Sequence, residues 1–148
     1  MKNFFIIFSL ALFTLSCGNQ SADAGETKSL PDSLFDEVIA GHDVAMPKMP
    51  KLERLLKQTR QAIDSVNQLP AAKQKELSAY KAQLDSTLKA LEYGDAAMTE
   101  WMNGFKYDSF KNNEAERIKY LQSELEKVNK MKDAVLSGIS KADSIFAR

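Results

Sequence analysis

Hydrophobic residues recur at alternating intervals of three and four along most of the chain after residue 31, and polar residues separate them. This is the spacing of a heptad seam, which follows one face of an α-helix. No run of β-branched residues alternates with polar residues as in a half-buried strand. The pattern therefore predicts an all-α protein.

The seams divide into three long helices. The first begins near Asp32, the second opens at Pro70 and stops at Gly104, and the third begins at Asn113, where Glu116 completes a capping-box-like pair. The predicted seams are Phe35, Val38, His42, Ala45, Met49, Leu52, Leu56, Thr59, Ile63 and Val66; Leu77, Tyr80, Leu84, Thr87, Leu91, Gly94, Met98, Trp101 and Phe105; and Ile118, Leu121, Leu125, Val128, Lys132, Val135, Ile139, Ala142 and Phe146.

Two prolines, Pro47 and Pro50, interrupt the first predicted helix. Proline cannot donate a backbone hydrogen bond, so we expect a kink or short break near residues 43–50. Short links make neighbouring helices antiparallel. Residues 31–148 are therefore predicted to form an antiparallel three-helix, up-down-up, coiled-coil-like bundle with a proline kink or break in helix 1.

The N-terminal segment has the pattern of an export signal. A short basic start is followed by an apolar stretch from Phe4 to Leu15, which is typical of a secretory signal peptide and shorter than the ~20 residues of a membrane span. The only cysteine, Cys17, follows at once and resembles the lipobox cysteine of bacterial lipoproteins, although Thr14 stands where the common lipobox has leucine. An ordinary signal peptide followed by an unmodified thiol is the alternative.

The lipobox resemblance implies three segments. Residues 1–16 would be a lipoprotein signal peptide, Cys17 would be lipidated, and residues 17–30, which are mostly small and polar, would form a flexible tether. The protein would then be anchored to the inner or outer membrane of the cell envelope, facing the periplasm or the surface.

Charge and composition exclude several classes of function. The 20 basic and 20 acidic residues balance, so no basic face for nucleic acid is expected. One histidine cannot form a His-pair zinc site, and no glycine-rich phosphate loop is present. Acidic residues fall outside the seams, as on a solvated helix face, so we expect no enzymatic activity. They are Glu76, Glu92, Glu114, Glu116, Glu124 and Glu126.

The stretch GHDVAMPKMP holds the single histidine, His42. In a hairpin centred on residues 69–70, Met98 would lie beside His42, and Met46 and Met102 would lie within about one helical turn. Thioether and imidazole ligands suit Cu(I). The register therefore predicts a candidate Cu(I) site at these four residues.

Other interpretations of this group of four residues remain open. Methionine often fills gaps in irregular cores, and in the second interpretation His42 is an ordinary core residue of the seam. A haem with His/Met ligation is a third alternative. Asp43 would orient the imidazole, while Met49 and Trp101 would pack nearby. Gly94 would face Ala45, so either the helix backbones approach closely or a small cavity remains.

Two short motifs carry a resemblance. The pattern His42-Asp43-x-x-Met46-Pro47-x-Met49 and the downstream Met98-x-x-Trp101-Met102 resemble a group of small Bacteroidota lipoproteins, some labelled viral A-type inclusion protein. In this chain Ala97 precedes Met98, where a second methionine is expected. The resemblance implies a lipoprotein and adds no mechanism.

An aromatic group near the end of the second helix allows two interpretations: a small satellite core under the loop, or a patch that docks a partner. Its members are Tyr93, Trp101, Phe105, Tyr107 and Phe110. Taken together, the sequence predicts a lipid-anchored envelope protein with a binding or structural role and an envelope protein as partner. The alternative is a periplasmic metal-handling protein that binds Cu(I) through the His/Met cluster.

Overall fold

A computed structural model describes residues 28–146, and it confirms the all-α prediction for this range. Helices account for 87% of the described residues, which contain no strand. The predicted signal peptide and the lipidation site, Cys17, lie outside the described range. The elements are α1 (Leu30–Ala45), the 3₁₀ turn η1 (Met46–Lys48), α2 (Met49–Asn67), α3 (Ala71–Glu76), α4 (Ser78–Gly104) and α5 (Glu114–Phe146).

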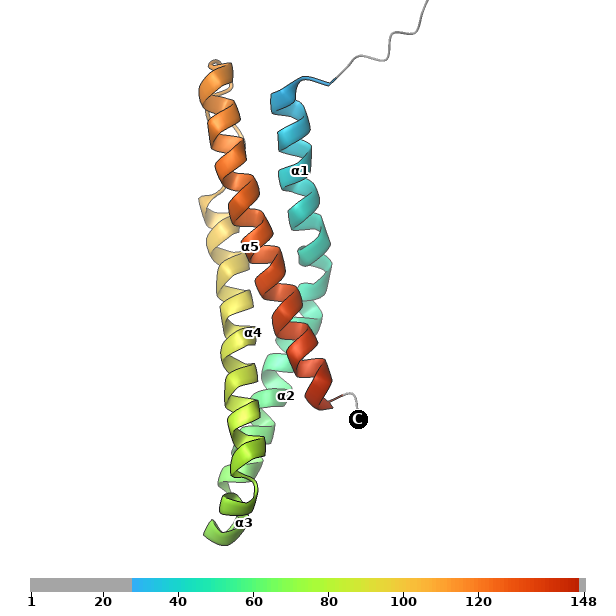
Figure 1. The fold of residues 1–148 in the computed structure, drawn as a ribbon, viewed down its shortest axis with the longest axis vertical. Coiled ribbons are helices and arrows are strands. Elements are labelled where there is room, and N and C mark those ends of the chain that lie inside the picture. Colours follow the sequence, from blue (N-terminus) through green and yellow to red (C-terminus); the bar gives the residue numbers. More distant parts are fainter. Residues whose placement is uncertain (1–27, 147–148) are drawn as a thin grey trace, which may run out of the picture.

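The helices form an elongated assembly (Figure 1). The chain descends through α1 and α2, turns at α3, returns through α4 and descends again as α5. Helix α5 packs against α1, α2 and α4, and α4 also packs against α2. The core therefore runs along the length of the assembly, where the apolar faces of these helices meet. Its fully buried members include Val38, Leu52, Leu91, Val128 and Val135.

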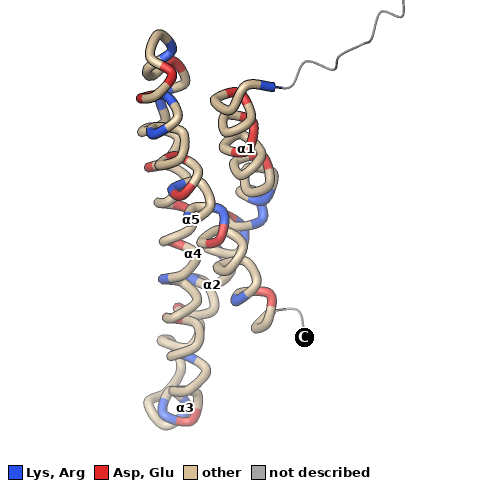
Figure 2. Tube along the Cα trace, turned by 45° about the horizontal axis from the view of Figure 1, so that its top comes forward, with Lys and Arg blue, Asp and Glu red and all other residues tan. Residues whose placement is uncertain are grey.

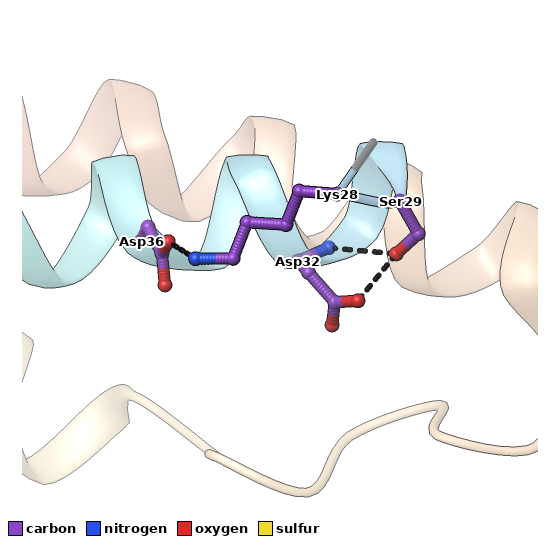
Figure 3. A network of polar contacts seen from close by, with 4 residues as sticks. All are labelled: Lys28, Ser29, Asp32 and Asp36. Atoms are coloured by element: carbon purple, nitrogen blue, oxygen red, sulfur yellow. Dashed lines mark hydrogen bonds and ion pairs between the residues drawn. The ribbon is translucent and has the colours of Figure 1, made fainter. Parts of the chain in front are cut away.

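Helix α1 begins at Leu30, two residues before the predicted start, because Ser29 caps it. The backbone N–H of Asp32 donates to Ser29 Oγ at 3.3 Å, and Ser29 Oγ donates to Asp32 Oδ2 at 2.6 Å. A Ser at this position satisfies one of the free N–H groups of the first turn. Lys28 also pairs with Asp36 one turn further on, as Figure 3 shows.

The two prolines coincide with a change of helix type. The turn η1 separates α1 from α2, and Pro47 lies within it. Pro50 lies in the first turn of α2, where the missing N–H has no helical partner to lose. The N–H of Met46 still bonds to the carbonyl of His42, so the chain passes the prolines without an irregular loop.

The second predicted helix is not continuous, which corrects the sequence prediction. Leu77, predicted to lie in its seam, separates α3 from α4 and has φ −92° and ψ 9°. Helix α4 ends at Gly104 as predicted. The predicted cap of the last helix is also present, because the N–H of Glu116 donates to Asn113 Oδ1 at 3.2 Å.

Glycines allow α5 to approach its neighbours closely. A Cβ atom at Gly138 would lie 3.0 Å from the carbonyl oxygen of Ala90, and one at Gly94 would lie 3.1 Å from the Cα of Val135. Gly94 therefore faces α5 and, at 3.2 Å, a methyl of Leu52. The predicted pairing of Gly94 with Ala45 is therefore wrong, and the backbone that approaches Gly94 belongs to α5 and not to the first helix.

Charged residues of both signs lie along every part of the assembly, as Figure 2 shows. No helix among residues 28–146 is both long enough and apolar enough to cross a membrane.

Candidate functional site

His42 lies on α1 one turn before η1, and its side chain is 21% exposed. Its Nδ1 is 2.9 Å from Asp43 Oδ1. Its ring lies 5.4 Å from the ring of Trp101, tilted by 31°. The carboxylate fixes the orientation of the imidazole and leaves Nε2 as the nitrogen for any further ligand. Asp43 and Trp101, which the sequence analysis placed near His42, are thus both next to its ring, and their role at a metal stays a prediction.

The four methionines of the predicted level lie at different depths. Met98 is a core residue, Met49 packs partly buried against the core, and Met46 and Met102 are 43% and 48% exposed. On α4, the residue whose ring meets His42 is Trp101. Within the described chain, no three His, Cys, Asp or Glu residues lie together as a metal site. Ligation of Cu(I) by His42 and the methionines stays a prediction.

An aromatic stack continues from His42 toward the α4–α5 connection. The Trp101 and Phe105 rings are 5.0 Å apart and nearly parallel, with 17° between their planes. Phe105 and Tyr120 follow at 6.3 Å, and Tyr120 and Phe110 at 5.9 Å. Such pairs stabilise beyond the area they bury, so the stack connects the His42 region rigidly to that end of the assembly.

A hollow of about 290 Å³ lies between α4 and α5, and sequence reasoning missed it. Tyr93, Trp101 and Met131 supply apolar surface, while Glu124 and Lys127 supply charge. The remaining lining residues are Ala97, Glu100, Gly104 and Lys130.

Glu124 gives the hollow its chemistry. The residue is only 2% exposed, and its Oε1 accepts a hydrogen bond from Lys127 Nζ at 2.8 Å. This bond raises the pKa of Lys127, against a smaller opposing effect of burial. A buried carboxylate requires such a partner, because burial penalises an unpaired charge.

The sequence interpretation placed Glu124 on a solvated face, and that interpretation is wrong. Helix α5 is rotated so that Glu124 and Met131 are buried, while Leu125 and Lys132 are only partly buried. Gly138 lies on the same face of α5 and comes close to the backbone of α4. Glu124, Met131 and Gly138 are spaced by seven, so a second heptad position was the available signal.

Two buried polar atoms have no hydrogen-bond partner among residues 28–146: Trp101 Nε1 and Thr87 Oγ1. A buried donor without a partner destabilises the fold. Trp101 is also a lining residue of the hollow. The hollow thus combines a flat aromatic face with a carboxylate acceptor and an ammonium donor, which is an arrangement for binding a partly apolar, partly polar group.

Comparisons with known proteins gave no match: no protein family matches the sequence, no curated protein is similar to it, and no solved structure matches its fold.

Proposed function

We propose that this chain is a lipid-anchored binding protein of the cell envelope, without enzymatic activity, attached through Cys17. One observation carries the binding role: the α4–α5 hollow contains a carboxylate, Glu124, that is 2% exposed and lies beside aromatic residues. A buried carboxylate costs stability unless it is paired, and a few placed polar groups in a largely apolar hollow are typical of binding sites. The resemblance to small Bacteroidota lipoproteins agrees with the anchor.

The proposed architecture is a three-arm antiparallel bundle. In it α1, η1 and α2 act as one arm kinked at the prolines, α3 and α4 as the second, and α5 as the third. The shared contacts of α5 with α1, α2 and α4 support this arrangement. Such a bundle presents the hollow on its side as a preformed surface, which lowers the ordering cost of binding.

The proposed partner is an envelope protein that inserts a side chain with a hydrogen-bond donor toward Glu124 and covers Tyr93. Tyr93 is 65% exposed and lines the hollow. Tyrosine and tryptophan are the residues that most often dominate binding energy at protein interfaces.

Site-specific photocrosslinking tests the binding role. A photoreactive phenylalanine derivative replaces Tyr93 in the anchored, full-length protein in living cells, and the same group at Tyr80 of α4 is the matched control. We expect a discrete adduct from position 93 that is lost in a Glu124→Gln background, and none from position 80. No adduct at 93, or one unaffected by Glu124→Gln, would refute a site built on Glu124.

Metabolic labelling tests the anchor separately. Cells given radioactive palmitate should label the wild-type protein and leave Cys17→Ala unlabelled and in the soluble fraction. Labelling of the variant, or membrane association without any label, would exclude Cys17 as the anchor.

Cu(I) handling is the second candidate, because the Asp43 carboxylate bonds to His42 Nδ1 at 2.9 Å. This is the contact that commonly orients a metal-binding imidazole. Met46 follows His42 by four residues and therefore lies on the same helix face.

Titration with Cu(I) against a chromophoric chelator tests this candidate. His42→Ala and Met98→Leu should both weaken competition, but Met98 is a core residue, so its loss also affects packing. Met46→Leu and Met102→Leu are the sharper variants, because both side chains are exposed. A wild-type protein that takes no Cu(I) from the chelator would refute the metal site.

A further inference from the structure

The end of the assembly where α1 begins also carries the α4–α5 connection (Figure 1). Three large apolar side chains are exposed there: Leu30 at 56%, Tyr107 at 58% and Phe110 at 50%. We call these three residues the tip. The Tyr107 ring packs edge-on against Phe35 of α1 at 5.1 Å, so the connection and the start of α1 form one continuous surface.

The backbone of the tip is firmly held. Arg117 Nη1 donates to the carbonyl of Ser109 at 2.9 Å and to that of Tyr107 at 3.3 Å. The backbone N–H of Lys106 donates to the Tyr120 hydroxyl at 2.6 Å. The exposed aromatic rings are therefore presented by a fixed loop.

Phe110 is the only described residue other than glycine with positive φ, at 59°. A bulky side chain is unfavourable in this left-handed region, where glycine or asparagine is usual. The chain thus places an exposed phenylalanine where a small residue would relax the backbone. Strained positions of this kind concentrate at functional sites.

The charges at the tip neutralise one another. Lys111 pairs with Asp108 and lies 4.5 Å from the Tyr107 ring, and Lys28 pairs with Asp36. A surface of exposed aromatic residues without net charge is suited to the lipid–water interface, where tyrosine and other amphipathic rings are enriched.

The length of the predicted tether places the tip near such an interface. Eleven residues lead from Cys17 to Lys28, and a chain of this length reaches at most about 40 Å. Helix α5 has 33 residues and is about 50 Å long. A lipid on Cys17 therefore keeps the tip near the bilayer and allows the α3 end to lie farther away.

We propose that Leu30, Tyr107 and Phe110 rest in the headgroup region of the bilayer, so that the bundle stands upright with the α4–α5 hollow facing sideways. This inference rests on the proposed anchoring at Cys17. The contact is apolar, and it holds equally on zwitterionic and anionic lipids.

Amide hydrogen exchange on anchored protein tests the proposal. All described helices lie within residues 28–146, so the chain from residue 17 to 148 retains them. Its Cys17 thiol is coupled to a maleimide lipid in phosphatidylcholine vesicles. We expect exchange at residues 105–113 to slow about fivefold relative to the uncoupled protein, with no change in α3 and no reversal by high salt.

Variants separate contact from folding. Phe110→Gly suits the positive φ, although it gives up the contact with Tyr120, and it should abolish the protection across residues 105–109. Tyr80→Ser, which removes an exposed ring outside both the tip and the α4–α5 hollow, should leave the protection unchanged. Both variants are first shown to melt no lower than the wild type.

Three results would overturn the proposal: no protection at residues 105–113, protection of the α4–α5 hollow instead, or protection that high salt removes. Chemical coupling makes this test independent of lipidation in cells. Failure of palmitate labelling would therefore refute the proposed anchor at Cys17, while failure of the exchange experiment would refute the proposed upright orientation.

Discussion

Replacing Gly138 by alanine tests how closely α5 approaches α4. The new methyl group would lie 3.0 Å from the carbonyl oxygen and 3.2 Å from the carbonyl carbon of Ala90, and 3.3 Å from the Cα of Leu91. All three are backbone atoms, which cannot rotate away as a flexible side chain can. The two helices must therefore separate, and packing on both sides of the contact is lost.

The magnitude follows from two opposing effects. Overpacking a well-filled interface destabilises by about 1–3 kcal/mol, while alanine is better than glycine in a helix by about 1 kcal/mol. Gly104→Ala is the control for adding a methyl group, because one there would meet no atom within 4 Å. Gly104 is the last residue of α4, where alanine gains less over glycine than at the interior position 138, so the difference between the two variants is a lower bound on the clash. We expect Gly138→Ala to be the less stable of the two by up to about 3 kcal/mol.

Urea unfolding followed by circular dichroism measures this difference, with an unchanged slope showing that both variants unfold in the same way. In thermal unfolding it corresponds to a Tm about 4 °C lower per kcal/mol. If Gly138→Ala is as stable as Gly104→Ala, the helices are not in close contact at this position.

Three further predictions concern polar groups. Thr87→Val should stabilise the protein by about 1 kcal/mol in urea unfolding, because the Thr87 hydroxyl is buried without a partner. Thr59→Val should not stabilise it, because the equally buried Thr59 hydroxyl donates a hydrogen bond. Equal effects of the two substitutions would contradict the argument. The pKa of Lys127 is raised in the folded protein by its bond to Glu124. This bond therefore contributes its full stability at pH values below the ordinary lysine pKa of about 10.4, and the contribution is lost as the pH rises through the raised pKa. The stability advantage of the wild type over Lys127→Met should therefore be constant near neutral pH and disappear in strong alkali, and an advantage that persists there would exclude the ion pair as its source. Ser29→Ala should weaken the start of α1 by about 1 kcal/mol, seen as faster amide exchange in its first turn, while unchanged exchange would show that the cap contributes nothing.

The buried faces of the helices were predictable where heptad spacing alone decides them. On α4 the buried residues Leu84, Leu91, Met98 and Trp101 all belong to the predicted seam. The start of α5 was predictable for a local reason, since Asn113 and Glu116 form their cap within one turn. Both features depend on residues close together in the sequence.

The register between helices was not predictable, because it depends on the shape of the connection. The estimate placed the hairpin centre at residues 69–70, but the turn also includes α3. Gly94 therefore lies against Leu52, about two helical turns from the predicted Ala45. A smaller shift in the same direction, three residues from the predicted Met98, brings Trp101 to His42. The hollow was missed because the burial of Glu124 depends on how α5 packs against α4, which the spacing of apolar residues along α5 alone does not give.

Helix α5 contacts α1, α2 and α4, and it is the last of the described helices to be synthesised. Before it is made, only the contact between α2 and α4 can form among the longer helices, and the apolar face of α1 has no helix to cover it. The core of the described helices therefore closes only when α5 packs into place, and a chain cut off before α5 would leave Val38 and Leu52 without their cover.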